Sequence, residues 1–551
     1  MARSCFPLAG PGVAGSVDAA KCSETQQNYE DDIYIANQFG GYHTANWGTC
    51  QTSAANDQCL LDFNLPQNPL VYTTRTCNQG AVPPYYVDVR EPNDVVQAIS
   101  FVKKHKIPLV VKNSGHDYKG RSSGQGSLAL WTHNLQGIKR NKRFVPAGCP
   151  TNKTYDGVTL AAGTGFAQLY QFAEDNNITV LGGSSRTVGP SGGWIQGAGH
   201  GALSNMLGLG VDRALQFKIV TPDGKFLTAS PCQNTDLFWA IRGGGGSTFG
   251  VIMESTTTAA PKMTVQVGYV RFASLDPESS RKFTKLMIEL APQWAADGWG
   301  GYIQPGAITS QTSGFVMFTT KLNRQEAEAS MQPALDFARS LGQVPLNAEV
   351  GTETSFYQAF NKYLLPNDEL VNVPAAVGSR LIPRRNFQPA NQAQLLDALM
   401  NGANTAGSNV LGGNGGSGSL AYGGSPFQIL VTNPVNVASY PDSAVTPAWR
   451  YSLWHVLYAP TWNYDGDPTT NHIKANKAAQ FLRDITPGSG AYQNEASIFE
   501  PNHIQSFWGQ NNYNRLLSIK KKVDPNNIFT CWQCVGYNKD DPRFACYPKS
   551  G

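Results

Sequence analysis

The chain has 551 residues, of which 41% are hydrophobic and 15% charged, a balance that is typical of a globular protein with a large core and not of a disordered or fibrous one. Its formal net charge is only +4, and the run Lys520–Lys522 is best assigned to a solvated helix face, so the sequence indicates no nucleic-acid partner. It contains no stretch of eighteen consecutive apolar residues, so we expect no membrane span.

The ten cysteines lie in loop-like contexts. Their even number predicts disulfides formed in an oxidising compartment. The alternative, a zinc site at Cys531-Trp-Gln-Cys534, lacks a second cysteine pair or a suitably spaced histidine, and we expect no metal. Sequons at Asn152 and Asn177 are compatible with a secreted glycoprotein. The first residues have no apolar signal-peptide core; either a signal peptide has been removed or the protein is intracellular, and we favour removal and secretion.

Residues 1–80 are rich in Cys, Asn, Gly and Gln and show little periodicity, which predicts a disulfide-stapled N-terminal extension without chemistry of its own. Tyr85–Val89 then alternates as a strand does. Asn93 or Asp94 is a good N-cap for a helix that presents Val95, Ile99 and Val102 on one face. A second strand, Leu109–Val111, follows. This order predicts a βαβ unit that ends in a loop.

The loop after the second strand is polar and rich in glycine and serine, with His116 at its tip. Small residues at such a turn let several backbone N–H groups approach an anion, as a pyrophosphate cradle requires. The residues in question are Ser114, Gly115, Gly120, Ser122, Ser123 and Gly124. A plain surface loop is the alternative interpretation of the same composition.

Gly115, His116 and Tyr118 resemble the flavin-attachment loop of the vanillyl-alcohol-oxidase and berberine-bridge-enzyme superfamily, which has a PCMH-type FAD-binding domain. The resemblance implies that His116 is bonded covalently to the C8 methyl group of FAD and that Tyr118 lies on the substrate side of the flavin. It also implies cofactor contacts for Lys112, Asn113, Ser114, Gly115, Asp117 and Ser122.

A second glycine-rich block spans Gly182–Asp212. Its Gly197-Ala-Gly-His-Gly201 run could be mistaken for a dinucleotide fingerprint, but the preceding strand and the later acidic residue are not clearly present, so we reject a Rossmann domain. The block resembles the superfamily's second flavin segment. The resemblance implies cofactor contacts for Gly182, Ser185, Thr187, Val188, Gly189, Gly192, Gly193, Gly197 and His200. It also implies that the glycine turn at Gly163 contacts the cofactor.

Ser185 stands where doubly linked members of the superfamily carry a cysteine. A hydroxyl cannot replace the thiolate in that linkage, so we expect a single covalent bond, through His116. Val188 matches the position that tunes oxygen access in the superfamily, and a small branched residue there suggests an oxidase more than a dehydrogenase. The glycine run from Arg242 ends at Gly250 and Val251, which we also expect against the cofactor.

These blocks assign residues 81–260 to the FAD-binding domain. Between residues 261 and 500 the pattern changes to strands at Val265–Phe272 and Gly314–Lys321 and amphipathic helices at Ser279–Ala296 and Arg324–Leu341. We therefore predict an α+β fold: a two-part PCMH-type FAD-binding domain plus a substrate domain whose antiparallel sheet is covered by helices on one face.

Pro447–Trp462 resembles the substrate-domain strand that carries the catalytic base in many relatives. Leu457 stands where a Glu or Gln is common, and it cannot accept a proton. His455 shares its face of the strand and is a candidate base, although a histidine satisfied by its strand neighbours is an equal alternative. Tyr118 and Tyr458 are the other candidates.

The tail from Asn512 to Phe529 resembles the berberine-bridge C-terminal signature. We expect residues 501–551 to return to the FAD-binding domain and to place Tyr513 and Asn514 beside the flavin.

Together these features predict a secreted, monomeric FAD oxidase that takes a hydride from a CH–OH or similar donor and passes electrons to O2, giving H2O2. The donor would be a small molecule: an alcohol, a carbohydrate or a secondary metabolite. A single flavin bond mildly disfavours an oligosaccharide oxidase. The alternatives are an oxidative cyclase of secondary metabolism and a flavin-binding protein that has lost turnover.

Overall fold

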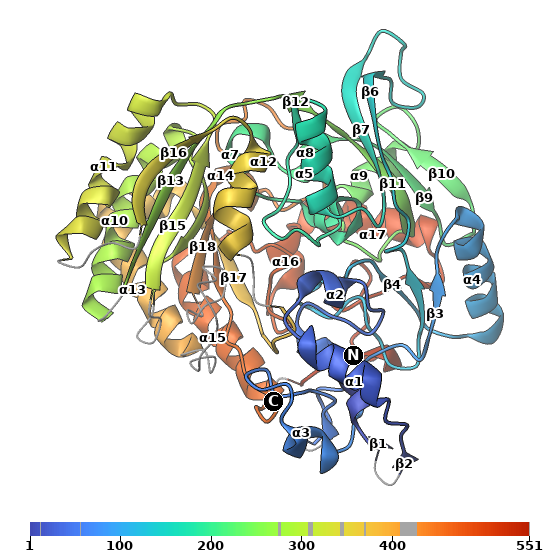
Figure 1. The fold of residues 1–551 in the computed structure, drawn as a ribbon. Coiled ribbons are helices and arrows are strands. Elements are labelled where there is room, and N and C mark those ends of the chain that lie inside the picture. The colour runs from blue at the N-terminus through green and yellow to red at the C-terminus, as the bar shows by residue number, and fades with distance from the viewer. Residues whose placement is uncertain are drawn as a thin grey trace.

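The computed structural model describes residues 1–10, 13–54, 57–273, 277–306, 312–341, 347–367, 371–407 and 427–549. Within these ranges the chain forms three main sheets with helices packed around them (Figure 1). None of the helices in the described ranges is both long and apolar enough to cross a membrane.

The first sheet is small and parallel, with the strand order β3 (Tyr85–Asp88), β5 (Leu128–Trp131) and β4 (Leu109–Lys112). Helix α4 (Pro92–His105) connects β3 to β4 and buries Val95, Ile99 and Val102. It begins with Pro92 and a capping box between Glu91 and Asp94, which satisfies backbone N–H groups at its first turn. The predicted βαβ unit is therefore present, and β4 leads directly into the His116 loop.

The second sheet has five antiparallel strands in the order β10 (Phe226–Ala229), β9 (Ala214–Val220), β11 (Val251–Thr258), β7 (Tyr155–Ala161) and β6 (Ile138–Phe144). Helices α5 (Phe166–Asp175) and α9 (Thr235–Ile241) belong to the same part of the chain. The parallel and antiparallel sheets together give this part the two-part organisation that the sequence predicted.

The third sheet has seven antiparallel strands in the order β16 (Asn347–Glu353), β13 (Val265–Ala273), β15 (Thr312–Thr319), β14 (Gly300–Gln304), β18 (Phe427–Val431), β19 (Ser452–Tyr458) and β17 (Gly378–Pro383). Figure 1 shows the helices α10 (Pro277–Ala296), α11 (Arg324–Ser340), α13 (Pro389–Ala406) and α15 (Pro468–Ile485) gathered on the outer side of this sheet. Side chains from these four helices and from the sheet form one apolar cluster. The predicted α+β fold with a helix-covered antiparallel sheet is confirmed.

The N-terminal residues form short helices, α1 (Ala19–Gln27), α2 (Asp32–Ala36) and α3 (Pro69–Thr73), and the C-terminal region contains α16 (His503–Phe507) and α17 (Gln510–Val523). All ten cysteines are paired: Cys5–Cys22, Cys50–Cys546, Cys59–Cys77, Cys149–Cys232 and Cys531–Cys534. The disulfide Cys50–Cys546 joins the two ends of the chain, which lie close together in Figure 1. The predicted disulfides are confirmed, and the CxxC motif is one of them.

Candidate cofactor cavity

Distant parts of the chain meet around a cavity of about 1250 Å³, counting its open mouth. Its walls come from the His116 loop after β4, the glycine-rich segment 183–200, residues 246–252 before and within β11, and residues 492–495 of the C-terminal region. Tyr302 of β14 adds the seven-stranded sheet to this lining.

The His116 loop turns sharply because Gly115 has a φ of +87°, and a Cβ there would lie 2.8 Å from the carbonyl oxygen of Gly41. Only glycine fits this position without strain. The N–H group of His43 donates to the carbonyl oxygen of Gly115 at 3.0 Å, so the N-terminal extension packs directly against the loop. The ring of His43 lies against that of His116, with 4.5 Å between their centroids.

His116 is partly buried, and its Nε2 atom lies 2.7 Å from the hydroxyl oxygen of Thr187 in the second glycine-rich segment. Burial and the nearby side chains of His43 and Lys112 hold the pKa of His116 well below its ordinary value. The imidazole is therefore neutral at physiological pH, which is the form that can act as a nucleophile or ligand.

Polar side-chain atoms of Asn113 and Ser122 in the cavity wall have no hydrogen-bond partner among the described residues. The side-chain nitrogen of Asn113 donates to the carbonyl oxygen of Ala162 at 2.5 Å and to Thr132 at 3.2 Å, but its Oδ1 atom accepts nothing. The hydroxyl of Ser122 is likewise unpartnered. Buried polar atoms are normally paired, so these two indicate that the cavity holds a polar ligand.

Glycines keep the opposite wall open. A Cβ built on Gly193 meets nothing within 4 Å, so a side chain at this cavity-lining position would project into empty space. Gly189 packs against the side chain of Asn113, and Gly246 against Gly193. Exposed backbone of this kind can approach a flat ring or a pyrophosphate closely, and together with the unpartnered oxygens it fits FAD.

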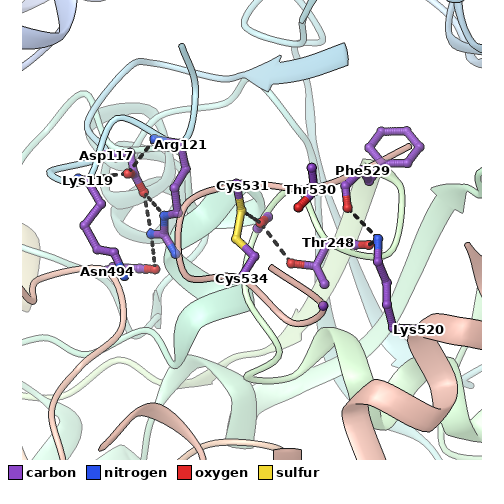
Figure 2. Close-up of a disulfide and its surroundings, with 12 residues drawn as sticks. Asp117, Lys119, Arg121, Thr248, Asn494, Lys520, Phe529, Thr530, Cys531 and Cys534 are labelled. Carbon is purple, nitrogen blue, oxygen red and sulfur yellow. Dashed lines mark hydrogen bonds and ion pairs between the residues drawn. A yellow bond between two sulfur atoms is a disulfide. The ribbon is translucent and has the colours of Figure 1, made fainter. Parts of the chain in front are cut away.

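Arg121 connects the His116 loop to the C-terminal region across the cavity wall (Figure 2). Its guanidinium forms an ion pair with Asp117 and donates to Oδ1 of Asn494 at 2.7 Å. Asn494 in turn donates to the carbonyl oxygen of Gly193 at 2.9 Å. Burial alone would raise the pKa of Asp117, but the charge and hydrogen bonds of Arg121 hold it below its ordinary value.

The C-terminal disulfide lies beside this wall (Figure 2). Cys531 contacts the carbonyl oxygen of Gly246 at 3.6 Å, and Lys520 donates to the carbonyl oxygen of Thr248 at 2.8 Å. These contacts anchor the tail of the chain on the cavity segment 246–248.

Most of the cofactor residues that the sequence proposed lie in the cavity wall. They are Asn113, Ser114, Gly115, His116, Asp117, Tyr118, Ser122, Ser185, Val188, Gly189, Gly192, Gly193, His200 and Gly250. Thr187 contacts His116 instead.

Five further proposed cofactor residues do not line the cavity. Gly163, Gly182 and Gly197 have no room for a Cβ because they pack on His133, on Tyr170 and Phe166, and on Asn494, respectively. Val251 is buried in a neighbouring apolar cluster. Lys112 points away from the cavity, because its ammonium group bonds to the N-terminal extension.

Tyr513 and Asn514, which we expected beside the flavin, are placed elsewhere and require a correction. Both are on α17, where Tyr513 packs on Trp508 and Asn514 accepts from Gln510. Tyr492 and Asn494 take the expected position in the cavity wall. The C-terminal sequence offers more than one tyrosine–asparagine pair, and the pair chosen from the sequence is one that the fold places on a helix.

Strand β19 has different surroundings on its two faces. Leu457 belongs to an apolar cluster with Val377, Leu430 and Ala459, against which the cavity residues Tyr118 and Tyr302 pack. Tyr458 points the other way, donating to the carbonyl oxygen of Leu399 at 3.0 Å in the core beneath the helices. Of the three proposed bases, only Tyr118 lines the cavity.

His455 is fully buried, and its Nε2 atom lies 2.9 Å from Oε2 of Glu495. The other oxygen of Glu495 lies 3.3 Å from Nε2 of His200. His200 and Glu495 both line the cavity. Sequence reasoning missed Glu495, whose only signal was a polar Gln-Asn-Glu run directly after Tyr492.

Comparison with known proteins gives consistent matches. A model of the FAD binding domain matches residues 83–230, and a model described as berberine and berberine like matches residues 491–536. FAD-linked oxidoreductase ffsJ of Aspergillus flavipes is 36% identical over 94% of this chain and 86% of its own length. FAD-linked oxidoreductase cheF of Chaetomium globosum is 33% identical over 99% and 85%.

Among solved structures, the VAO-type flavoprotein MtVAO615 of Myceliophthora thermophila superposes with a TM-score of 0.82 at 28% identity, covering 98% of this chain and 93% of that chain. A carbohydrate oxidase of Microdochium nivale shares the fold, with a TM-score of 0.62 at 19% identity over 82% and 92% of the two chains.

Proposed function

This chain belongs to the FAD-linked oxidoreductases of the vanillyl-alcohol-oxidase and berberine-bridge superfamily, and we propose that it is an oxidase that oxidises a CH–OH group of a small molecule. The observation that carries this proposal is His116: a partly buried, neutral imidazole at the tip of a glycine turn, in the wall of a cavity that is also lined by glycine backbone.

We infer that FAD is attached covalently, by one bond, to His116. Thr187 fixes the ring through Nε2, and low proton affinity keeps the imidazole in its nucleophilic form. Ser185, in the wall, offers a hydroxyl where a second bond would need a thiolate. The backbone of Gly189, Gly192 and Gly193 would lie along the cofactor, which when bound would supply the hydride acceptor and transfer electrons to O2, giving H2O2.

The substrate side of the cavity is aromatic and apolar. Tyr118 and Tyr302 line it, and behind them lie Val377, Leu430 and Leu457. Such a wall suits a donor with an apolar body better than a polyhydroxylated sugar, whose hydroxyls would lose hydrogen bonds to water without replacement. This favours an alcohol of secondary metabolism as the donor, and it keeps oxidative cyclisation of such a molecule as the second candidate function.

Oxidation of an alcohol leaves a hydroxyl proton that a side chain must accept. Of the residues that the sequence proposed, Tyr118 is in the cavity and His455 reaches it through Glu495, while Tyr458 faces the core. Secretion is part of the same proposal: five disulfides suit an oxidising compartment, and the sequon residue Asn152 is exposed.

The oxidase proposal is tested by reducing the purified protein anaerobically with dithionite and then admitting air. We expect the oxidised flavin spectrum to return rapidly with one equivalent of H2O2 per flavin. A slow return would contradict an oxidase and would favour a flavin-binding protein or a dehydrogenase. A peroxide-scored panel of apolar, aromatic and sugar alcohols then identifies the donor class.

A further inference from the structure

Three polar side chains from distant parts of the chain converge at one end of the cavity wall. His200 comes from the second glycine-rich segment, His455 from β19 and Glu495 from the C-terminal region. One nitrogen or oxygen atom from each lies within 4.8 Å of the others. Each carboxylate oxygen faces its own imidazole, at 3.3 Å for His200 and 2.9 Å for His455.

The hydrogen-bond geometry of this cluster favours an ionised Glu495. Nε2 of each histidine faces the carboxylate, so each imidazole can donate an Nε2–H group to one carboxylate oxygen. Neither Nδ1 atom has a partner in the described part of the chain. Burial lowers the pKa of His455. Burial opposes the charge on Glu495, but His200 and His455 hold the pKa of its carboxyl well below the ordinary value. Glu495 is therefore ionised.

The surroundings keep that charge in place. Tyr492 packs edge-on against both imidazoles, and burial raises the pKa of its phenol, so it stays neutral. Trp449 packs on both rings as well. The nearest cation in this wall, Arg121, is paired with Asp117. Of the three groups in the cluster, Glu495 is the most exposed, with 18% of its side chain accessible against 8% for His200 and none for His455.

We propose that Glu495 is the catalytic residue that accepts the hydroxyl proton of the donor, with His200 and His455 as the positioning residues that orient its two oxygens. The proposal rests on the oxidase function proposed above. In the step, the donor's C–H bond breaks with its electron pair going to the bound flavin, its O–H bond breaks with the proton going to a carboxylate oxygen, and a C=O bond forms.

A base at Glu495 accounts for the lack of a proton-accepting side chain at position 457 of β19. Leu457 lies in an apolar cluster, and its side chain has no atom that can accept a proton. His455, two residues earlier on the same strand, contacts Glu495 instead. The C-terminal region thus supplies the carboxylate of Glu495, and His455 on β19 orients it through a hydrogen bond.

The first test compares the wild type with Glu495→Gln and Glu495→Asp in anaerobic stopped flow, using the alcohol from the peroxide panel that bleaches wild-type flavin fastest. Glu495→Gln should slow bleaching by about a hundred-fold or more, and Glu495→Asp should retain part of the rate. Reoxidation of dithionite-reduced flavin by O2 should be unchanged in both variants. Glu349→Gln, exposed on β16, is the matched control and should bleach at the wild-type rate.

The second test needs no donor. The infrared band of a protonated carboxyl, isolated by subtracting the Glu495→Gln spectrum, reports the pH at which Glu495 takes up a proton. In the wild type this band should appear only well below the ordinary glutamate value of about 4.3. His455→Phe should move it to higher pH, because only the hydrogen bond from His200 then opposes the effect of burial. His455→Gln, which retains an N–H group that can donate to Glu495, should restore much of the shift.

The outcomes separate the two proposals. If no alcohol in the panel bleaches the wild-type flavin, the proposed function is overturned and the role of Glu495 with it. If the wild type is bleached and Glu495→Gln is bleached equally fast, only the role of Glu495 is overturned. A wild-type carboxyl that is already protonated near neutral pH would also overturn it.

Discussion

The ammonium group of Lys112 donates a hydrogen bond to the carbonyl oxygen of Phe39 at 2.7 Å. Lys112 is the last residue of β4, four positions before His116, and it is fully buried. A second bond, to the carbonyl oxygen of Gln38 at 3.1 Å, completes the attachment. The sequence predicts that Lys112 contacts the cofactor. Instead, Lys112 links the N-terminal extension to the strand that leads into the His116 loop.

Lys112 should make stability depend on pH. Burial lowers its pKa to about 7, whereas the value in an unfolded chain is about 10.4. Between these values the unfolded state binds a proton that the folded state does not, so this residue's contribution to stability rises with pH across that window. The unfolding free energy of the wild type minus that of Lys112→Met, measured in guanidinium, should therefore increase from about pH 7 to pH 10. A constant or falling difference would contradict the burial of this amine.

The Cys50–Cys546 disulfide should stabilise the folded chain strongly, because it closes a loop with a sequence separation of 496. Replacing both cysteines with serine should cost roughly 2–5 kcal/mol of unfolding free energy. Chemical unfolding under non-reducing conditions measures this cost. The pair Cys149–Cys232, with a separation of 83, is the matched comparison and should cost less. Equal stability of wild type and Cys50→Ser/Cys546→Ser would show that other contacts hold the ends together.

Placing a glutamate at position 457 of β19 should destabilise the folded protein. Leu457 is buried in an apolar cluster, so Leu457→Glu would bury a carboxylate without a cationic partner and should lower the unfolding free energy by about 3–5 kcal/mol. Leu457→Met conserves volume and should cost less than about 1.5 kcal/mol. Thermal and chemical unfolding of the two variants provides the comparison. A stable Leu457→Glu protein with faster flavin reduction would mean that the strand, not Glu495, is the natural site of the base.

The lack of a side chain at Gly193 should be required to leave room for the cofactor, but it should not be required for folding. A Cβ at this position meets nothing within 4 Å and faces the cavity. Gly193→Val should therefore keep a melting temperature close to that of the wild type but bind substantially less flavin, measured as the ratio of flavin to protein absorbance. Gly193→Ala should lie between the two. Full flavin occupancy in Gly193→Val would show that the cofactor does not pass along this wall.

The sequence allowed much of the cavity wall to be predicted because its residues lie in short continuous segments. The turn at Gly115, the histidine at the loop tip and the glycines from Gly189 to Gly193 lie in short continuous stretches whose backbone requirements are visible in the residue types themselves. The α+β architecture follows in the same way from strand and helix periodicity.

The proton-handling cluster was not predictable by the same reasoning. His200, His455 and Glu495 lie in three elements, and only the tertiary fold brings them together. The strand pattern placed His455 correctly on the face of Leu457, but it could not show that this face is covered by Tyr118 and Tyr302 or that a carboxylate from the C-terminal region reaches the imidazole.

The covalent role of His116 is the central claim, and the mass of the denatured chain tests it most directly. Acid-precipitated wild-type protein should be heavier than its polypeptide by the mass of one FAD, whereas His116→Ala should have the polypeptide mass and release its flavin to the supernatant. A wild-type chain that carries no flavin after denaturation, or a His116→Ala chain that still does, would contradict the account.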